Sequence, residues 1–268
     1  MKKYTNNIFK KIAIILIFNI FLLPLKAAVD VRIITKINNE IITNIDIEEE
    51  YNYLIALNND LKNLDIKSGF TIAKNSLIRE KIKKNELEKY YDLDSEVPLL
   101  ENVVKDFYNK LNLNNKEEFK EYLNNFDLDF IDVRNKIKLE LFWNRLIQER
   151  FANQLNIDTK ILEKKIKDEG LANKIAVSYN LSEIVFEIKD NDLETTLSKI
   201  NESINTAGFK NTANIFSISN TAKFGGEIGW IEESKLSKTI IESLQSIDIG
   251  EITKPINIAN GFLIVKLL

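Results

Sequence analysis

The chain has 268 residues, of which 44% are hydrophobic and 29% charged, a composition typical of a globular protein with one large or two modest domains. It contains no Cys and no His, which excludes a disulfide framework, a thiolate zinc site, a Cys nucleophile and a His general base. Carboxylate chemistry, hydroxyl or lysine nucleophiles, carboxylate-bound metal and binding without catalysis remain open.

Residues 1–27 have the pattern of a secretory signal peptide. Four lysines precede the apolar run Ile12–Leu25, and the small residues Ala27 and Ala28 follow it. The alternative is a membrane anchor, but this run has 14 residues, whereas a spanning helix needs about 20. Pro24 would also break its end. We therefore predict cleavage after Ala27 or Ala28, export to a bacterial periplasm, and membrane contact only before cleavage.

Loss of the predicted leader changes the charge of the chain. The leader carries five lysines and no acidic residue, so its removal takes the formal net charge from −3 to −8. A protein of this charge is not expected to bind nucleic acid or anionic lipid through bulk electrostatics.

Residues 28–170 are predicted to form a mainly helical domain that starts with a small β-hairpin. The segment Val31–Ile42 is rich in β-branched residues and has polar turn residues at 38–40, a pattern typical of a hairpin. Thr43 is placed to cap the helix that follows it. Further helices are predicted over residues 71–91, 97–111, 116–124, 129–153 and 158–169. We interpret the charged faces opposite their apolar stripes as solvated helix surface.

Glycines mark a change of pattern, since six of the eight fall in the last 61 residues, where they favour strands and tight turns. We place a boundary at 170–174 and predict an α+β domain with a mostly antiparallel sheet over residues 175–268. Its expected order is β-α-(α)-β-α-β-β. The strands are expected at 176–188, 226–231, 251–256 and 261–268, and the helices from Leu193 and over 237–246.

The first of these strands has two different faces. Ser182, Ile184 and Phe186 share one side of it, and Leu181, Glu183 and Val185 share the other side.

Three strings in this half resemble the parvulin-type (PpiC-type) peptidyl-prolyl isomerases. Asn180–Phe186 (NLSEIVF) is similar to the opening strand of that fold, and Gly225–Trp230 (GGEIGW) to its Gly-Gly-x-x-Gly-Trp turn. Gly250–Lys266 is similar to its closing hairpin. The three matches come in the right order with the right spacing, which makes the resemblance specific.

The first half resembles the SurA family of periplasmic chaperones for outer-membrane proteins. The start at Val29, the predicted hairpin and the helix capped by Thr43 are similar to the beginning of mature members. The helix 129–153, followed by residues 156–158, is similar to the approach to their first parvulin domain. The chain departs from the family in carrying one parvulin-like domain rather than two, and in ending on a strand at Leu268.

The resemblance implies where a catalytic centre would lie. Parvulins are known for two His in the sheet and a Cys or Asp on a facing loop; the matching positions are Glu183, Leu263 and, by counting back from Gly226, Ser219. All three are substituted. Glu183 could instead be a solvated or Lys-paired acid, and Ser219 a loop or capping hydroxyl.

The resemblance also implies an apolar substrate-binding site. Its proline-contacting positions correspond to Ile228, Leu236 and Ile240, with Phe262 next to Leu263. The alternative is that these are ordinary core residues.

The resemblance thus implies a periplasmic folding factor whose partners are unfolded or extended polypeptides, among them outer-membrane proteins. We favour a holdase with a degenerate parvulin domain. An active prolyl isomerase and an assembly subunit that uses the fold as a docking surface are the alternatives. No cofactor is expected. No metal site is expected either, because the acidic residues Asp127, Asp129 and Asp132 lack the Gly and bidentate Glu of an EF-hand loop and are expected to open a helix.

Overall fold

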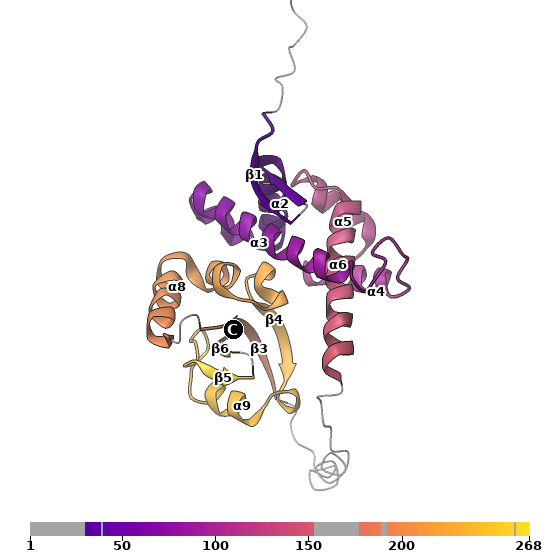
Figure 1. Cartoon of the computed structure of the whole chain (residues 1–268). Coiled ribbons are helices and arrows are strands. Elements are labelled where there is room, and N and C mark those ends of the chain that lie inside the picture. The colour runs from indigo at the N-terminus through magenta and orange to yellow at the C-terminus, as the bar shows by residue number, and fades with distance from the viewer. Residues whose placement is uncertain (1–29, 39, 153–176, 189–191, 260) are drawn as a thin grey trace, which may run out of the picture. The chain divides into compact units, whose positions relative to one another are not determined.

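The computed structural model describes residues 30–38, 40–152, 177–188, 192–259 and 261–268. The predicted leader, the predicted helix 158–169 and the predicted boundary at 170–174 lie outside these residues. Ile33–Leu268 forms one compact unit. In it a helical region precedes a region built on a four-stranded sheet (Figure 1). The mixed α+β fold with antiparallel sheets confirms the predicted fold class.

The helical region begins with the predicted hairpin. Strands β1 (Ile33–Ile37) and β2 (Glu40–Thr43) pair antiparallel. Helix α2 (Asn44–Leu57) follows, and Thr43 caps it as predicted: Thr43 Oγ1 accepts a hydrogen bond from the Asp46 backbone N–H at 3.2 Å. The Asp46 carboxylate accepts one from the Thr43 N–H at 2.6 Å, which completes a reciprocal capping box.

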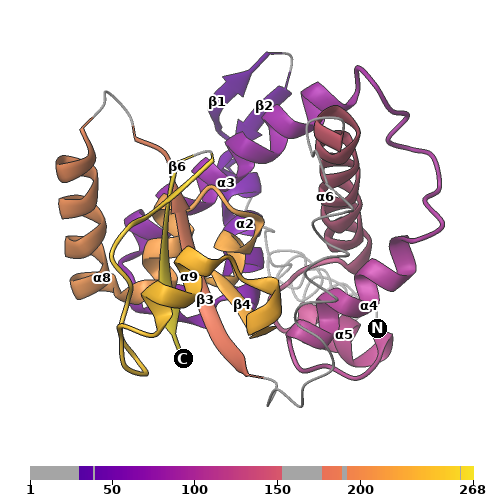
Figure 2. The ribbon, with the colours of Figure 1, turned by 90° about the horizontal axis from the view of Figure 1, so that it is seen from below.

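Further helices enclose the core of this region, and α4 and α5 lie next to each other beside α6 (Figure 2). The elements are η1 (Asn59–Asn63), α3 (Ile66–Leu87), α4 (Leu100–Lys110), α5 (Lys116–Asn124) and α6 (Phe130–Phe151). The most deeply buried apolar side chains include Leu54, Leu61, Leu100, Phe119 and Leu123. None of the helices in the described ranges is both long enough and apolar enough to cross a membrane.

The predicted bounds of one helix, 71–91, were wrong. Helix α3 starts earlier, because Asp65 caps it by accepting a hydrogen bond from the Ser68 N–H at 3.0 Å. Gly69, a residue that often ends helices, lies inside its first turns. A Cβ atom there would lie 2.4 Å from Cε2 of Tyr51, so this glycine permits close packing of α3 on α2.

The second region contains a sheet with the strand order β4-β3-β6-β5, in which all pairs are antiparallel, as predicted (Figure 1). Helix α8 contains a break at Gly208. The elements are β3 (Ser178–Phe186), α8 (Leu193–Phe216), η3 (Asn220–Phe224), β4 (Glu227–Glu232), η4 (Glu233–Lys235), α9 (Lys238–Leu244), β5 (Ile256–Ile258) and β6 (Gly261–Leu267).

The two faces of the central strand pack against different helices. Ile184 and Phe186 join a cluster with Ile200 of α8. Leu181 joins a cluster with Leu244 of α9 on the other face. The strand is therefore covered on both sides, and the second face carries the predicted site positions.

One closing strand differs from the prediction. Strand β5 begins only at Ile256, and in the predicted strand 251–256 Ile252 forms an isolated bridge with Lys266. Pro255 has no backbone N–H, which removes a donor from a regular ladder.

Candidate functional site

Glu183, one predicted site position, lies in the middle of strand β3. It stands directly opposite Val265 of β6. Its backbone N–H donates a hydrogen bond to the Gly226 carbonyl at 2.7 Å. The backbone of Glu183 is therefore held from both sides, and its side chain is half-buried.

The turn at Gly225 and Gly226 brings the loop η3 against this strand. Gly226 has a φ of 80°, and a Cβ atom there would lie 2.1 Å from the carbonyl oxygen of Glu183. A side chain at this position would therefore push the loop away from β3. The double glycine serves the backbone turn, as the sequence indicated.

The structure brings Glu183 and Ser219 together. Ser219 Oγ donates a hydrogen bond to Glu183 Oε1 at 2.6 Å. Thr221 Oγ1 donates to the same oxygen at 2.9 Å and lies 3.0 Å from Ser219 Oγ. Thr221 was not among the predicted site residues, although its hydroxyl lies only two residues after the predicted capping Ser219.

The geometry supports the capping role predicted for Ser219 but not a Lys partner for Glu183. Ser219 does cap η3, because its Oγ accepts a 3.4 Å hydrogen bond from the Thr221 N–H. Glu183 has no ion pair within the described residues and bonds to hydroxyls instead. A carboxylate held by two hydroxyls joins β3 to the loop.

Leu263, the third predicted position, lies on the same face of the sheet as Glu183. It is 7% exposed and stands opposite Val185 of β3. The predicted substrate-contacting residues Ile228, Leu236 and Ile240 are half-buried and pack against the cluster to which Leu263 belongs. The second His position of the parvulin centre is therefore occupied by an apolar leucine that cannot donate or accept a proton, and it lies beside an apolar surface.

Phe262 does not lie with these residues. Neighbouring residues of a strand point to opposite faces, so Phe262 packs against the cluster on the α8 face. Its ring stacks on Phe186, with ring centroids 5.8 Å apart. Its grouping with the apolar site residues was therefore wrong.

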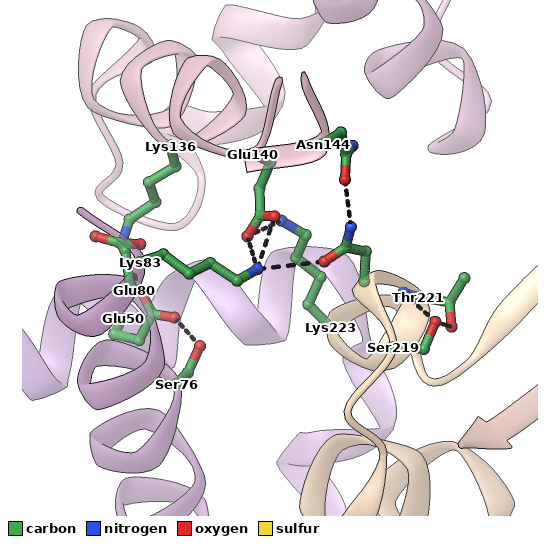
Figure 3. A network of polar contacts seen from close by, with 11 residues as sticks. Glu50, Ser76, Glu80, Lys83, Lys136, Glu140, Asn144, Ser219, Thr221 and Lys223 are labelled. Atoms are coloured by element: carbon green, nitrogen blue, oxygen red, sulfur yellow. Dashed lines mark hydrogen bonds and ion pairs between the residues drawn. The ribbon is translucent and has the colours of Figure 1, made fainter. Parts of the chain in front are cut away.

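The helical region holds the loop η3 from the other side (Figure 3). Lys223 Nζ of η3 lies 3.7 Å from Glu140 Oε1 of α6, and Lys83 Nζ of α3 lies 2.8 Å from Glu140 Oε2. Asn220 donates to Oδ1 of Asn144 at 3.0 Å and accepts from Lys83 Nζ at 3.2 Å. The loop that carries Ser219 is thus bonded to two helices.

Burial shifts the pKa values of the charged groups in this network. Desolvation lowers the pKa of the Lys223 ammonium, and the neighbouring Glu140 opposes that effect. For Glu140 burial acts to raise the pKa, but the ammonium groups of Lys223 and Lys83 together hold it below its ordinary value. A cavity of about 80 Å³ lies between these side chains and residues 217–220.

A second ion-pair group lies deeper in the helical region. Lys136 Nζ of α6 lies 2.8 Å from Glu50 Oε2 and 2.6 Å from Glu80 Oε2. The side chain of Glu50 is 1% exposed, and it also accepts a hydrogen bond from Ser76 Oγ at 2.6 Å. The interpretation of the charged helix faces as solvated surface was therefore wrong for this group.

Within the described residues, no group of three or more acidic side chains could hold a metal ion. Asp129, considered in the sequence as part of an acidic cluster, caps α6 by accepting a hydrogen bond from the Ile131 N–H at 2.6 Å.

Comparison with known proteins relates this site to a family. Residues 181–268 match the rotamase family, described as a PPIC-type PPIase domain. The chaperone SurA of Pseudomonas putida is 28% identical over 159 residues, which cover 56% of this chain and 37% of that protein. The chaperone SurA of Pseudomonas syringae pv. tomato is 26% identical over 161 residues, which cover 57% and 37%. The chain thus spans little more than a third of the length of these curated relatives.

Solved structures of larger coverage are more distant. SurA-like chaperones of Campylobacter jejuni match with 19% identity over 88% of this chain and 81% of theirs, with a TM-score of 0.30. PrsA of Bacillus subtilis matches with 16% identity over 88% and 77%, also with a TM-score of 0.30. Values of this size do not establish a common arrangement of the whole chain.

Proposed function

We propose that this protein, whose residues 181–268 are a PpiC-type parvulin domain, is a periplasmic folding factor. The proposal also proceeds from the similarity of the chain to SurA chaperones. The protein binds unfolded outer-membrane proteins as a holdase. In this proposal a leader (1–27) directs export, a helical domain (28–170) takes part in client binding, and the parvulin-like domain (175–268) is degenerate at its catalytic positions.

The state of the three catalytic positions supports the holdase function most directly. An isomerase must stabilise a twisted amide whose rotation is otherwise slow. The second His position holds the buried Leu263, which offers no polar group. The first His position holds Glu183, whose Oε1 atom already accepts hydrogen bonds from Ser219 and Thr221. This arrangement favours binding over proton exchange.

Exposed apolar surface on the helical region supports client binding. Ile34 and Ile66 are 45% and 58% exposed. With Ile47 and Phe70 they line a groove of about 420 Å³ beside the hairpin. Contiguous exposed apolar surface of this kind typically marks an interaction site, and an unfolded polypeptide offers matching apolar side chains.

The experiment that tests the proposal pairs two assays on the same protein. Light scattering follows the aggregation of an unfolded porin-like client, and a prolyl-peptide assay follows isomerisation. We expect suppressed aggregation with no acceleration of isomerisation. Failure to suppress aggregation would contradict the chaperone function.

An active isomerase is the second candidate, and the apolar residues Ile228, Leu236 and Ile240 favour it, because they pack beside Leu263 on the face that carries Glu183. Acceleration of isomerisation that is lost on Leu236→Ala or Ile240→Ala would establish catalysis and overturn the holdase-only function. A control at the exposed Ile215 of α8, Ile215→Ala, should leave either activity unchanged.

A further inference from the structure

The carboxylate of Glu183 is only partly used by the protein. Both hydroxyl donors, Ser219 Oγ and Thr221 Oγ1, reach the same oxygen, Oε1. Within the described part of the chain no hydrogen bond or ion pair reaches Oε2. Lys223, the cation of the neighbouring loop, pairs with Glu140 instead. Glu183 therefore keeps one acceptor oxygen, Oε2, available for a ligand.

This free oxygen belongs to the face of the sheet that carries the apolar site residues. Glu183 shares one face of β3 with Leu181 and Val185, and both of these pack in the cluster that includes Leu236 and Ile240. A half-buried carboxylate beside an apolar surface is poorly solvated, so a cation that reaches it gains more than it would at an exposed acid.

Further negative charge lies on the same face. Tyr179 also packs in this cluster, and its hydroxyl donates to Glu233 Oε2 at 2.9 Å. Over residues 178–268 the sequence has twelve acidic and eight basic side chains. The field of this region therefore attracts positive groups and repels acidic ones.

We propose that this face selects extended polypeptide segments in which a Lys or Arg lies next to an apolar residue. The apolar side chain packs on Leu236 and Ile240, and the cation pairs with Glu183 Oε2. The inference rests on the proposed function, since it names the class of segment that the parvulin-like domain of a folding factor would bind.

Three labelled peptides of equal length test this selection on the unaltered protein. They share one apolar residue and carry Lys, Gln or Glu beside it, and fluorescence anisotropy measures their affinities at low and high salt. We expect the Lys peptide to bind about three- to tenfold more tightly than the Gln peptide, as for a partly buried ion pair. The Glu peptide should bind most weakly, and the differences should shrink at high salt.

A matched pair of variants assigns the preference to one residue. Glu183→Gln removes the charge but keeps an oxygen that can accept from Ser219, and it should reduce the Lys-over-Gln preference to less than twofold. Glu227→Gln is the control, because Glu227 lies opposite Ser182 and so belongs to the other face of the same sheet. It should keep the full preference.

The outcomes separate this inference from the proposed function. Equal affinities for all three peptides, together with suppressed client aggregation, would overturn the inference and leave the chaperone function standing. A Lys preference that survives in a folded Glu183→Gln protein would also overturn it. Absence of both peptide binding and aggregation suppression would contradict the proposed function itself.

Discussion

Asn58 donates a hydrogen bond from Nδ2 to Oδ1 of Asn214 at 2.6 Å, although 156 residues separate the two. Asn58 follows helix α2, and Asn214 lies in the last turns of α8, and both side chains are buried. Asn214 also donates from Nδ2 to the Ala222 carbonyl of η3 at 2.7 Å. One buried amide thus connects the helical region with the loop that carries the site.

The first prediction concerns this amide. Asn214→Ala removes two buried hydrogen bonds, although Asn58 Nδ2 keeps a 3.3 Å bond to Asn211 Oδ1 and the Ala222 carbonyl keeps one from the Gly225 N–H at 2.9 Å. At the usual net worth of a hydrogen bond, the loss of two should lower the free energy of unfolding by about 1–3 kcal/mol. Urea denaturation measures the loss. Asn205→Ala, at an exposed position of the same helix, is the control and should change stability little, since surface substitutions usually stay within about 0.5 kcal/mol.

The second prediction concerns the buried ion-pair group. Lys136→Met removes the cation between Glu50 and Glu80 and leaves the buried Glu50 carboxylate without its counter-charge. Loss of one partner of a buried pair typically costs about 3–5 kcal/mol. Thermal and urea unfolding should show a loss at or somewhat below this range, because the Lys136 side chain is 20% exposed.

The control for this prediction is Lys105→Met on α4, an exposed lysine that makes no ion pair in the described structure. It should leave the free energy of unfolding nearly unchanged. A Lys136→Met protein as stable as the control would show that Glu50 is neutralised in another way and would contradict the role assigned to this pair.

Local pattern predicted much of the fold, because side-chain period reports which face of an element is covered. The two faces of β3 at Leu181 and Ile184 and the cap at Thr43 followed from the sequence in this way. The start of α3 at Ile66 could not be predicted in this way. Glycine is common at helix ends and unfavourable inside helices, so Gly69 does not indicate a helix in the sequence alone. Only the packing of Tyr51 against it shows why a glycine is tolerated there.

The sequence could not predict which charged residues form ion pairs, for a related reason. Periodicity places Glu50 and Lys136 on helices but does not say which helices face each other, so their pairing depends on tertiary packing. Glu183 and Ser219 were both identified, because family spacing maps them to one centre. Their direct hydrogen bond through Oε1 required the structure.

The third prediction is a pH dependence carried by Glu140. Burial acts to raise its pKa, but Lys223 and Lys83 hold that pKa below the ordinary value of 4.5. A carboxyl with a lowered folded-state pKa contributes stability that is present above its unfolded pKa, and this contribution is lost as the pH falls through the folded-state pKa. Stability should therefore decline below about pH 4.5.

Glu140→Gln separates this contribution from other acid effects. The variant should be less stable than the unaltered protein at neutral pH, and its stability should fall less steeply on acidification, as followed by urea midpoints from neutral pH to pH 3. Glu121→Gln, an exposed acid on α5 without an ion pair in the described structure, should keep the original slope. An unchanged slope in Glu140→Gln would show that this ion pair adds nothing to acid sensitivity.

The fourth prediction compares two glycines of one turn and strand. Gly226 and Gly229 have similar φ angles of 80° and 87°. A Cβ atom at Gly226 would lie 2.1 Å from the Glu183 carbonyl oxygen, whereas at Gly229 it would meet nothing within 4 Å. Gly229→Ala should therefore lower the free energy of unfolding by about 1–2 kcal/mol, the strain of an alanine in the left-handed backbone region. Gly226→Ala adds a backbone clash and should cost clearly more.

Urea unfolding of the two alanine variants measures that difference, and peptide binding reports whether the loop has moved. Because the clash falls on the residue that accepts from Ser219, Gly226→Ala should also weaken the Lys-over-Gln preference expected of Glu183. Gly229→Ala should keep this preference. Equal losses of stability in the two variants would mean that the backbone angle alone requires these glycines, and that the close approach of the loop to β3 does not constrain the site.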